Sequence, residues 1–289
     1  MSKSLWPLAA ARALLALPCL AAAPALAAAP VTFVSGKGTD AGTCASPANP
    51  CRSFEFALGQ TSPSGEIKAL DPAHYGGVTI TNSISITGVE GAGIDLDTAT
   101  DATTAVKTGA ITINAGADDT INLSHLTLDG LKTARSGIVL NSGGSLTITD
   151  CVVRNFEGAG VQLSPAANTA FLIQTTVVLD NGVGIGFSGQ GTGSVQGTLD
   201  HVLVTENGDG VFVGARATVL AVNSTAADNA SVGFVVFSGG ILRLAHSAVT
   251  ENLQGVIVVA GSMAESAGNN VIRGNGTDVD GTLTNVGTQ

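Results

Sequence analysis

Charged and aromatic residues are scarce in this chain. Of its 289 residues, 12% are charged and 4% are aromatic, with a single Trp and a single Tyr. Because sugar-binding sites are commonly built on aromatic platforms, this composition disfavours an extended glycan site. The formal net charge of −10 argues against nucleic acid and against anionic membranes as partners. The 38 glycines suit a tightly wound backbone better than a helical enzyme domain.

A long apolar run is missing from the chain after its first residues. No later segment approaches the roughly 18 residues of a membrane span, so we predict no transmembrane anchor. Residues 1–29 have the pattern of a signal peptide, because Lys3 and Arg12 precede the apolar segment 13–23 and Ala25-Leu26-Ala27 is a small-x-small cleavage site. The sequence therefore predicts a protein exported to the periplasm or the extracellular space.

The repeated part of the chain also lacks apolar residues at helical spacing. Apolar residues instead alternate with period two in short runs separated by Gly, Asn, Ser or Asp, which indicates strands and turns. The segment Asp150 to Leu163 combines an apolar run, a corner Asn, a Gly pair and an alternating strand, and this order recurs down the chain. The corner asparagines, 22 to 26 residues apart, are Asn155, Asn181, Asn207, Asn229, Asn252 and Asn275.

A period of about 24 residues fits one turn of a three-sided coil. We predict an all-β solenoid, a single-stranded right-handed parallel β-helix with a short N-terminal capping helix. The corner asparagines are expected to stack as a ladder of hydrogen-bonded side-chain amides.

The predicted organisation has three parts. They are a signal peptide (1–29), an N-terminal cap (30–77) and the coils of the β-helix (78–289). In the cap, Ser53 can cap a short helix that carries apolar residues at helical spacing and stops at Gly59. Such a helix would cover the open end of the first coil. Residues 98–108 are expected to form a loop insertion.

A set of short motifs marks the beginning of the exported chain. They are Phe33-Val34-Ser35-Gly36 with Gly38 and Asp40, Pro50 to Phe54, Leu70-Asp71-Pro72, Tyr75 to Ile80, and Ser83 to Gly88. These motifs resemble the N-terminal part of secreted bacterial proteins of the pectin-lyase-like β-helix superfamily. The resemblance implies the fold. It does not imply an activity, because the superfamily includes pectate lyases, polygalacturonases, epimerases, phage tailspikes and members without assigned chemistry.

The cysteines suit an oxidising compartment. Cys44 and Cys51 flank a short loop with two prolines, which favours a disulfide over metal binding by two thiolates. Cys151 falls in a column of inward positions, so we expect a buried free thiol rather than a reactive one.

The strand after each Gly pair allows a test for catalysis, because enzymes of the superfamily place Asp, Lys, Arg or His on the outward face of one stacked strand. Alternation places outward a row without a titratable group: Val139, Gln162, Gly186, Phe212, Val235 and Ile257. Five apolar side chains then form what we call the apolar strip: Phe212, Val235, Phe237, Ile257 and Val259.

We predict that the apolar strip is an interface with a protein partner or with a second copy. Two alternatives stay open. The chain after Gly261 could fold back over the strip, or a register shift of one residue could turn the strip inward.

Another column lies near a corner and comprises His125, Asp150, Thr176, His201, Ser224 and His246. His125 and Asp150, one coil apart, are candidate catalytic residues, and Lys132 and Arg135 are candidates for the same site. The competing interpretation is a set of solvated turn groups. The histidines lie too many coils apart to share one metal ion.

Calcium is the one cofactor that we consider, and its candidate ligands are Asp95, Asp97 and Asp101. Their spacing matches neither an EF-hand nor a calcium-binding β-roll. No other cofactor is predicted.

Two functions are therefore weighed. The first is a non-catalytic exported module with a structural or surface-interaction role. The alternative is a polysaccharide lyase, hydrolase or epimerase acting on an acidic glycan. The uncharged outward row favours the first.

Overall fold

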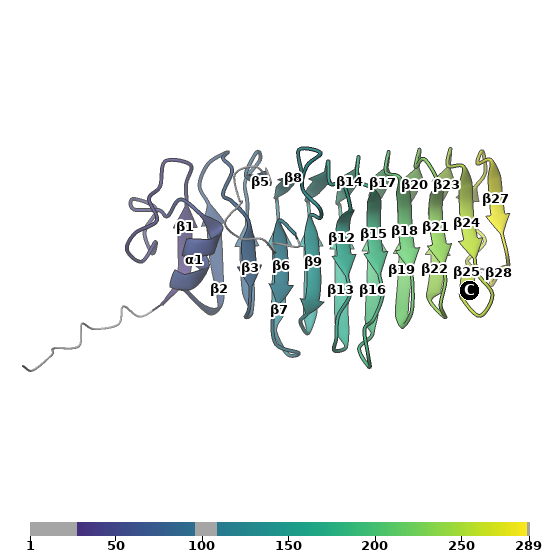
Figure 1. The fold of residues 1–289 in the computed structure, drawn as a ribbon, viewed down its shortest axis with the longest axis horizontal. Coiled ribbons are helices and arrows are strands. Elements are labelled where there is room, and N and C mark those ends of the chain that lie inside the picture. The colour runs from purple at the N-terminus through teal and green to yellow at the C-terminus, as the bar shows by residue number, and fades with distance from the viewer. Residues whose placement is uncertain (1–27, 96–108, 288–289) are drawn as a thin grey trace, which may run out of the picture.

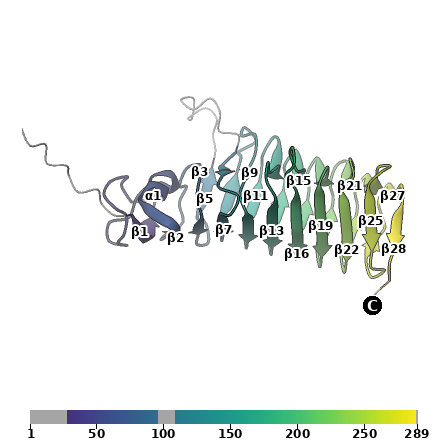
Figure 2. The same ribbon diagram turned by 90° about the horizontal axis from the view of Figure 1, so that it is seen from below.

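The computed structural model describes residues 28–95 and 109–287. The chain winds so that each strand pairs in parallel with the equivalent strand of the next coil, which builds three sheets along the long axis (Figures 1 and 2). We name them sheets A, B and C. The predicted signal-peptide residues 1–27, the insertion 98–108, Asp97 and Asp101 lie outside the described residues.

Sheet A is the longest, with 11 strands. They are β1 (Ala29–Val34), β2 (Thr61–Ala69), β4 (Ile84–Thr87), β7 (Thr120–Ser124), β10 (Ser145–Thr149), β13 (Thr169–Gln174), β16 (Val195–Asp200), β19 (Ala217–Val222), β22 (Ile241–Ala245), β25 (Met263–Ser266) and β28 (Leu283–Asn285).

Sheet B has 8 short strands. They are β5 (Gly93–Asp95), β8 (Thr127–Asp129), β11 (Val152–Arg154), β14 (Val177–Leu179), β17 (Leu203–Thr205), β20 (Thr225–Ala227), β23 (Ala248–Thr250) and β26 (Val271–Ile272).

Sheet C has 9 strands. They are β3 (Val78–Ile80), β6 (Ile111–Asn114), β9 (Ile138–Ser142), β12 (Ala159–Leu163), β15 (Val183–Phe187), β18 (Asp209–Val213), β21 (Val232–Val236), β24 (Gln254–Val258) and β27 (Thr277–Asp280).

The core is a set of stacked aliphatic columns. Strand β10 shows the pattern, because Leu146 and Ile148 are fully buried while the Ser and Thr residues between them face outward. Ile148 pairs in register with Leu123 on one side and Ile173 on the other. Each large aliphatic side chain buried in this way contributes roughly 1.5–3 kcal/mol, so the columns hold successive coils together.

The corner from sheet A to sheet B is a single residue with left-handed backbone. The corner residues, with φ between 47° and 56°, are His125, Asp150, Thr175, His201, Asn223 and His246. The sequence column had placed Thr176 and Ser224 here, one residue too far along. Asp200 ends β16 opposite Gln174 and Val222, so the next residues in register are Thr175 and Asn223.

The asparagine ladder lies at the corner from sheet B to sheet C. Asn181, Asn207, Asn229, Asn252 and Asn275 are joined by amide hydrogen bonds of 2.9–3.1 Å. The second amide hydrogen of each binds a backbone carbonyl of the preceding coil, as Asn207 Nδ2 does with Val178 O at 3.1 Å. The ladder thus satisfies backbone groups that the sharp turn leaves unpaired.

Asn155 is not part of this ladder, and that assignment was wrong. Arg154 pairs with Leu179, which puts Phe156 rather than Asn155 in register with Asn181. Asn155 is instead the left-handed corner residue, with φ of 63°, and its amide donates to Asp129 Oδ1 at 2.9 Å. The ladder therefore begins at Asn181, whose Oδ1 accepts the Phe156 N–H at 3.1 Å.

A second ladder follows the corner from sheet A to sheet B, and the sequence analysis missed it. Its members accept the backbone N–H of the preceding coil at 2.8–3.4 Å, and they are Thr176, Ser224, Ser247 and Asn270. Because Ser, Thr and Asn alternate in this column with apolar residues of other coils, no single residue type marks it.

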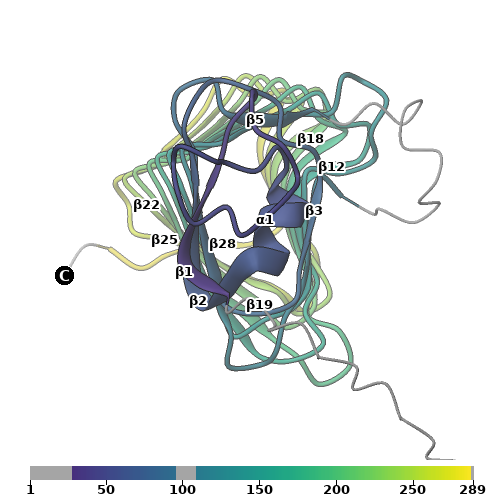
Figure 3. The same ribbon diagram turned by 90° about the vertical axis from the view of Figure 1, so that its left-hand side faces the viewer.

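The N-terminal end is closed by helix α1 (Phe54–Gln60), which packs against β1, β2 and β3 and lies across the end of the coil (Figure 3). Ser53 caps it as predicted, accepting the Phe56 N–H at 3.2 Å. The helix ends at Gln60 rather than at Gly59, and Thr61 is its C-cap.

The predicted disulfide between Cys44 and Cys51 is present. It joins the two ends of a loop that covers the outer edge of β1, because Phe33 N donates to Cys44 O and Cys51 N donates to Phe33 O, both at 2.9 Å. An edge that is otherwise open to pairing with another chain is thereby occupied. Cys151 is a buried free thiol, as expected, and burial raises its pKa to about 11.

Candidate functional site

The outward row of sheet C is the surface that the sequence analysis singled out. Strand register confirms its six members, since Gln162 lies between Val139 and Gly186, and Phe212, Val235 and Ile257 follow in order. The row continues to Thr79 and Thr112 on the N-terminal side. It ends at Asp280. Its only titratable side chain within the described coils is therefore the last one.

The apolar strip faces outward on this row. Phe212, Val235, Phe237 and Ile257 are half-buried, and Val259 is 45% exposed. The rings of Phe212 and Phe237 meet edge to face with centroids 6.0 Å apart. The inward-facing alternative is excluded, because the neighbours Val211, Val213 and Val236 are the fully buried ones.

The chain after Gly261 does not cover the strip. Strand β27 pairs in register with β24, and β28 pairs with β25, so these residues add a further coil to the stack. The described residues thus leave the strip on the surface of sheet C. An outward apolar patch of this kind is a common feature of interaction surfaces.

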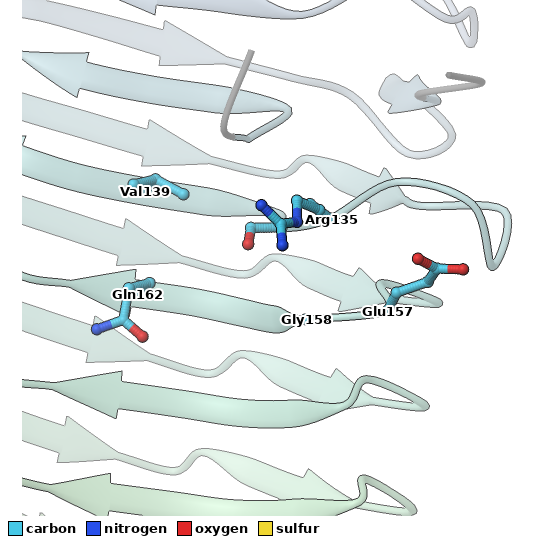
Figure 4. Close-up of a pocket in the computed structure, with 6 residues that line it drawn as sticks. Arg135, Val139, Glu157, Gly158 and Gln162 are labelled. Carbon is cyan, nitrogen blue, oxygen red and sulfur yellow. The ribbon is translucent and has the colours of Figure 1, made fainter. Parts of the chain in front are cut away.

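A pocket of about 400 Å³ opens beside Val139 and Gln162 of the same row (Figure 4). It is lined by Val139 on β9, by Gln162 on β12, and by Arg135, Ser136, Glu157 and Gly158, which precede these strands. Among the described residues, neither the Arg135 guanidinium nor the Glu157 carboxylate has a hydrogen-bond or ion-pair partner. The pocket therefore presents one free cation and one free anion beside the side chains of Val139 and Gln162.

The four candidate catalytic residues do not converge. His125 Nε2 lies 3.7 Å from Asp150 Oδ2, and both side chains are exposed at the corner that precedes sheet B. Lys132 follows β8 and instead binds the Asp180 carbonyl at 2.9 Å. Arg135 lines the pocket, whose walls include none of the other three. The proposed common site is thus divided between the two ends of the sheet B strands.

A column of ionised groups runs along the end of sheet B and was not anticipated. Asp95, Asp129 and Arg154 occupy the same position in β5, β8 and β11. Asp129 Oδ2 accepts from Arg154 Nε at 2.8 Å, and Asp95 Oδ2 lies 2.9 Å from His74 Nδ1. To predict this column from the sequence, one would need to know that β5 pairs with β8 across the insertion. The repeat spacing alone does not indicate that pairing.

The two carboxyl groups of this column have pKa values displaced in opposite directions. Burial raises the pKa of Asp95 above its usual range, the neighbouring Asp129 charge raises it further, and His74 opposes both. Burial acts the same way on Asp129, but hydrogen bonds from the Leu131 N–H, Asn155 and Arg154 outweigh it and lower its pKa. Split carboxyl pKa values occur in acid–base sites and also in structural ion-pair networks. The buried, fully bonded Asp129 fits the second case.

Asp95 was a calcium candidate, and in the structure its carboxylate is paired with His74, with Asp129 as its neighbour in the column. Within residues 28–95 and 109–287, no cluster of three or more His, Cys, Asp or Glu side chains is arranged to hold a metal ion.

The N-terminal motifs have a structural role. Asp71 accepts hydrogen bonds from Ser35 Oγ at 2.6 Å, Gly36 N at 2.8 Å and Tyr75 OH at 2.7 Å. These bonds, that from Ser35 first, lower the pKa of Asp71. Gly38 is required because a Cβ there would lie 2.2 Å from Cys51 O. These residues of the N-terminal motifs thus hold the cap together.

Comparison with known proteins agrees with this architecture. A family model described as the right handed beta helix region matches residues 136–287. The crystal structure of pectate lyase Pel9A aligns with a TM-score of 0.50 at 15% sequence identity, covering 90% of this chain and 78% of that one. At this identity the likeness concerns the fold. No curated protein sequence matches the chain. None of the described helices is long and apolar enough to cross a membrane.

Proposed function

The chain belongs to the right-handed β-helix family, and from that premise we propose that it is an exported, non-catalytic module that binds a protein through the apolar strip on sheet C. The observation that carries the proposal is the outward row, which runs from Thr79 to Ile257 without a titratable group. A surface that cleaves a polysaccharide needs a base or a pair of carboxyl groups beside the substrate. An apolar row suits contact with another apolar surface.

Export is the second part of the proposal. It rests on the signal-peptide pattern in residues 1–29 and is supported by the disulfide between Cys44 and Cys51, because disulfides persist in oxidising compartments. The protein would act in the periplasm or outside the cell.

The experiment is to measure binding of the fluorescently labelled mature protein to the surface and secreted proteins of its source cells. Phe212→Asp combined with Ile257→Asp should reduce binding at least tenfold while the melting temperature stays within a few degrees, because both side chains point outward. Leu220→Asp is the control, since Leu220 is an outward-facing apolar residue on sheet A, away from the strip, and is 36% exposed. Equal binding by the double variant and the control would refute the proposal.

The alternative function, cleavage of an acidic polysaccharide, is favoured only by the pocket of Arg135, Glu157 and Gln162. It is tested by incubating the mature protein with polygalacturonate and alginate and measuring unsaturated and reducing ends. We expect no release. Release that is lost on Arg135→Ala but kept in the strip variant would establish an enzyme and overturn the non-catalytic reading.

A further inference from the structure

Three asparagines of this chain are followed directly by glycine, and all three belong to the asparagine ladder. They are Asn181, Asn207 and Asn275. An asparagine before glycine loses its side-chain amide most readily, because glycine has no side chain to hinder attack by its own backbone nitrogen. The ladder therefore places the most reactive asparagines of the chain at the corner from sheet B to sheet C.

The reaction requires the glycine nitrogen to approach the side-chain carbonyl carbon of the preceding asparagine. A C–N bond forms between these two atoms, the C–N bond of the side-chain amide breaks, and ammonia leaves with the proton of the glycine N–H. Water then opens the cyclic imide, which gives aspartate or isoaspartate. Water is the co-reactant, so the conversion needs no enzyme.

The two inner sites are held away from this reaction. Gly182 N donates to Phe156 O at 2.9 Å and Gly208 N donates to Asn181 O at 2.8 Å, so both nitrogens are bound to the preceding coil. Asn181 and Asn207 are 4% and 1% exposed, and each side chain is bonded to the coil before it and to the coil after it. Either site can react only when its corner opens, which breaks contacts with two neighbouring coils.

Asn275 differs because it is the last member of the ladder. Gly276 N also donates to the preceding coil, to Asn252 O at 3.0 Å. On the outer side, the Asn275 amide donates to Asp278 Oδ1 of its own turn at 3.0 Å. Strand β27, which follows this corner, lies at the end of the stack and has no partner on its outer edge within the described residues (Figure 1). Opening this corner therefore breaks contacts with one coil instead of two.

From this difference we propose that Asn275 is a site of spontaneous modification, at which water converts the asparagine to aspartate or isoaspartate. The fold suppresses the same reaction at Asn181 and Asn207. The proposal is independent of what the apolar strip binds.

The modification loosens the last coil. Both products lack the amide that donates to Val249 O and Asp278 Oδ1 at 3.0 Å, and both set a new carboxylate against that of Asp278. Isoaspartate also lengthens the main chain, which shifts β27 out of its register with β24. Strand β24, which carries Ile257 of the apolar strip, then becomes the last strand of sheet C.

Asp278 restrains the reaction, because its Oδ1 holds both the backbone N–H and the side-chain amide of Asn275 at 3.0 Å. Asp278→Ala frees the side chain to turn toward Gly276 N and should speed the conversion about threefold to tenfold. Asp280→Ala is the matched control, since Asp280 is an exposed aspartate of the same strand whose side chain makes no hydrogen bond among the described residues. Equal rates in the two variants would show that Asp278 does not restrain the reaction.

The decisive experiment follows all three sites in one sample of the mature protein. Folded protein and protein in denaturant are kept at mildly alkaline pH in water enriched in heavy oxygen, which labels the product formed during incubation. Peptide mapping by mass spectrometry then measures the product at each asparagine over time. In denaturant the three sites should react at similar rates. In the folded protein Asn275 should react about tenfold faster or more than Asn181 and Asn207, because its corner opens most often.

The proposal is overturned if the folded protein converts the three sites at equal rates, or if Asn275 reacts as slowly as Asn207. A second measurement tests the loosening of the last coil. After conversion, hydrogen exchange should rise at the amides of β27 and stay unchanged at those of β10. Unchanged exchange in β27 of the fully converted protein would refute the structural consequence.

Discussion

Asn207 illustrates what one residue contributes to this fold. Its Oδ1 accepts the N–H and the side-chain amide of Asn181, both at 3.0 Å, and its own amide donates to three oxygens. It is 1% exposed, so water cannot replace these partners. Every hydrogen-bonding atom of the side chain is therefore committed to the turn.

Asn207→Ala should lower the free energy of unfolding by about 1–3 kcal/mol, because it leaves buried donors and acceptors unpaired. Chemical denaturation measures the change. Asn168→Ala is the control, since Asn168 is an exposed asparagine whose side chain, among the described residues, makes a hydrogen bond with Ser194 alone. If the two variants were equally stable, the hydrogen bonds of the asparagine ladder would not contribute to the free energy of unfolding.

Asp71 gives the cap a dependence on pH. Its pKa is lowered from 3.8 by hydrogen bonds to Ser35, Gly36 and Tyr75, so the folded state favours the ionised form. A carboxyl group whose pKa is lowered by folding stabilises the fold at pH values above its pKa in the unfolded chain. This stabilisation is lost as the pH falls through its pKa in the folded protein. We expect stability to decline below about pH 4.

The variant Asp71→Asn should be less stable at neutral pH and should lose less stability than the wild type between about pH 4 and pH 2. Thermal melts at a series of pH values measure this. Asp118→Asn is the matched control, because Asp118 is exposed and makes no side-chain hydrogen bond within the described residues. Parallel pH profiles for wild type and Asp71→Asn would assign the acid sensitivity to other groups.

At the scale of elements, the loop of Cys44 and Cys51 occupies the outer edge of β1. Replacing both cysteines by Ser should cost about 2–3 kcal/mol, the value for closing a loop of this length. Hydrogen exchange at the Phe33 and Ser35 amides, which bond to the loop, should rise more than at amides of β10. Reductant should destabilise the wild type but have no effect on the double variant, which separates the disulfide from other effects of reduction.

The same scale shows what the sequence could predict. Period-two alternation gave the outward row of sheet C correctly, because a glycine stands two residues before each of its six predicted members. Asn155 was misassigned because an asparagine also suits the left-handed corner one residue earlier. The column of Asp95, Asp129 and Arg154 and the pocket at Arg135 depend on the path of the chain through an insertion and a long turn, for which no repeat provides a template.

At the scale of the whole molecule, the two ends of the solenoid differ. The N-terminal end is closed by α1 and the disulfide loop, whereas β26, β27 and β28 have no partner strand on their outer side within the described residues. Each coil contacts mainly its neighbours, so stability is close to a sum over coils.

Deleting the residues after Gly261 removes β25 to β28 and should leave the preceding coils folded. The β-strand signal in circular dichroism should then fall in proportion to the strand residues removed. Deleting the cap up to Ala69 exposes the core and strand edges together, and we expect aggregation. Size-exclusion chromatography with circular dichroism compares the two truncations. Aggregation of both would mean that the last coil is also a cap.

The asparagine ladder has an electrical direction. In every rung the amide oxygen faces the preceding coil and the amide nitrogen faces the next, so the side-chain dipoles add along the axis. The positive end of the summed dipoles lies at Asn275. There, Asp278 Oδ1 accepts hydrogen bonds from the backbone N–H and from the side-chain amide of Asn275, both at 3.0 Å. The arrangement is the side-chain counterpart of an acid at a helix N-terminus. Asp278→Lys should therefore destabilise the last coil more than Asp278→Ala, and added salt should narrow the difference.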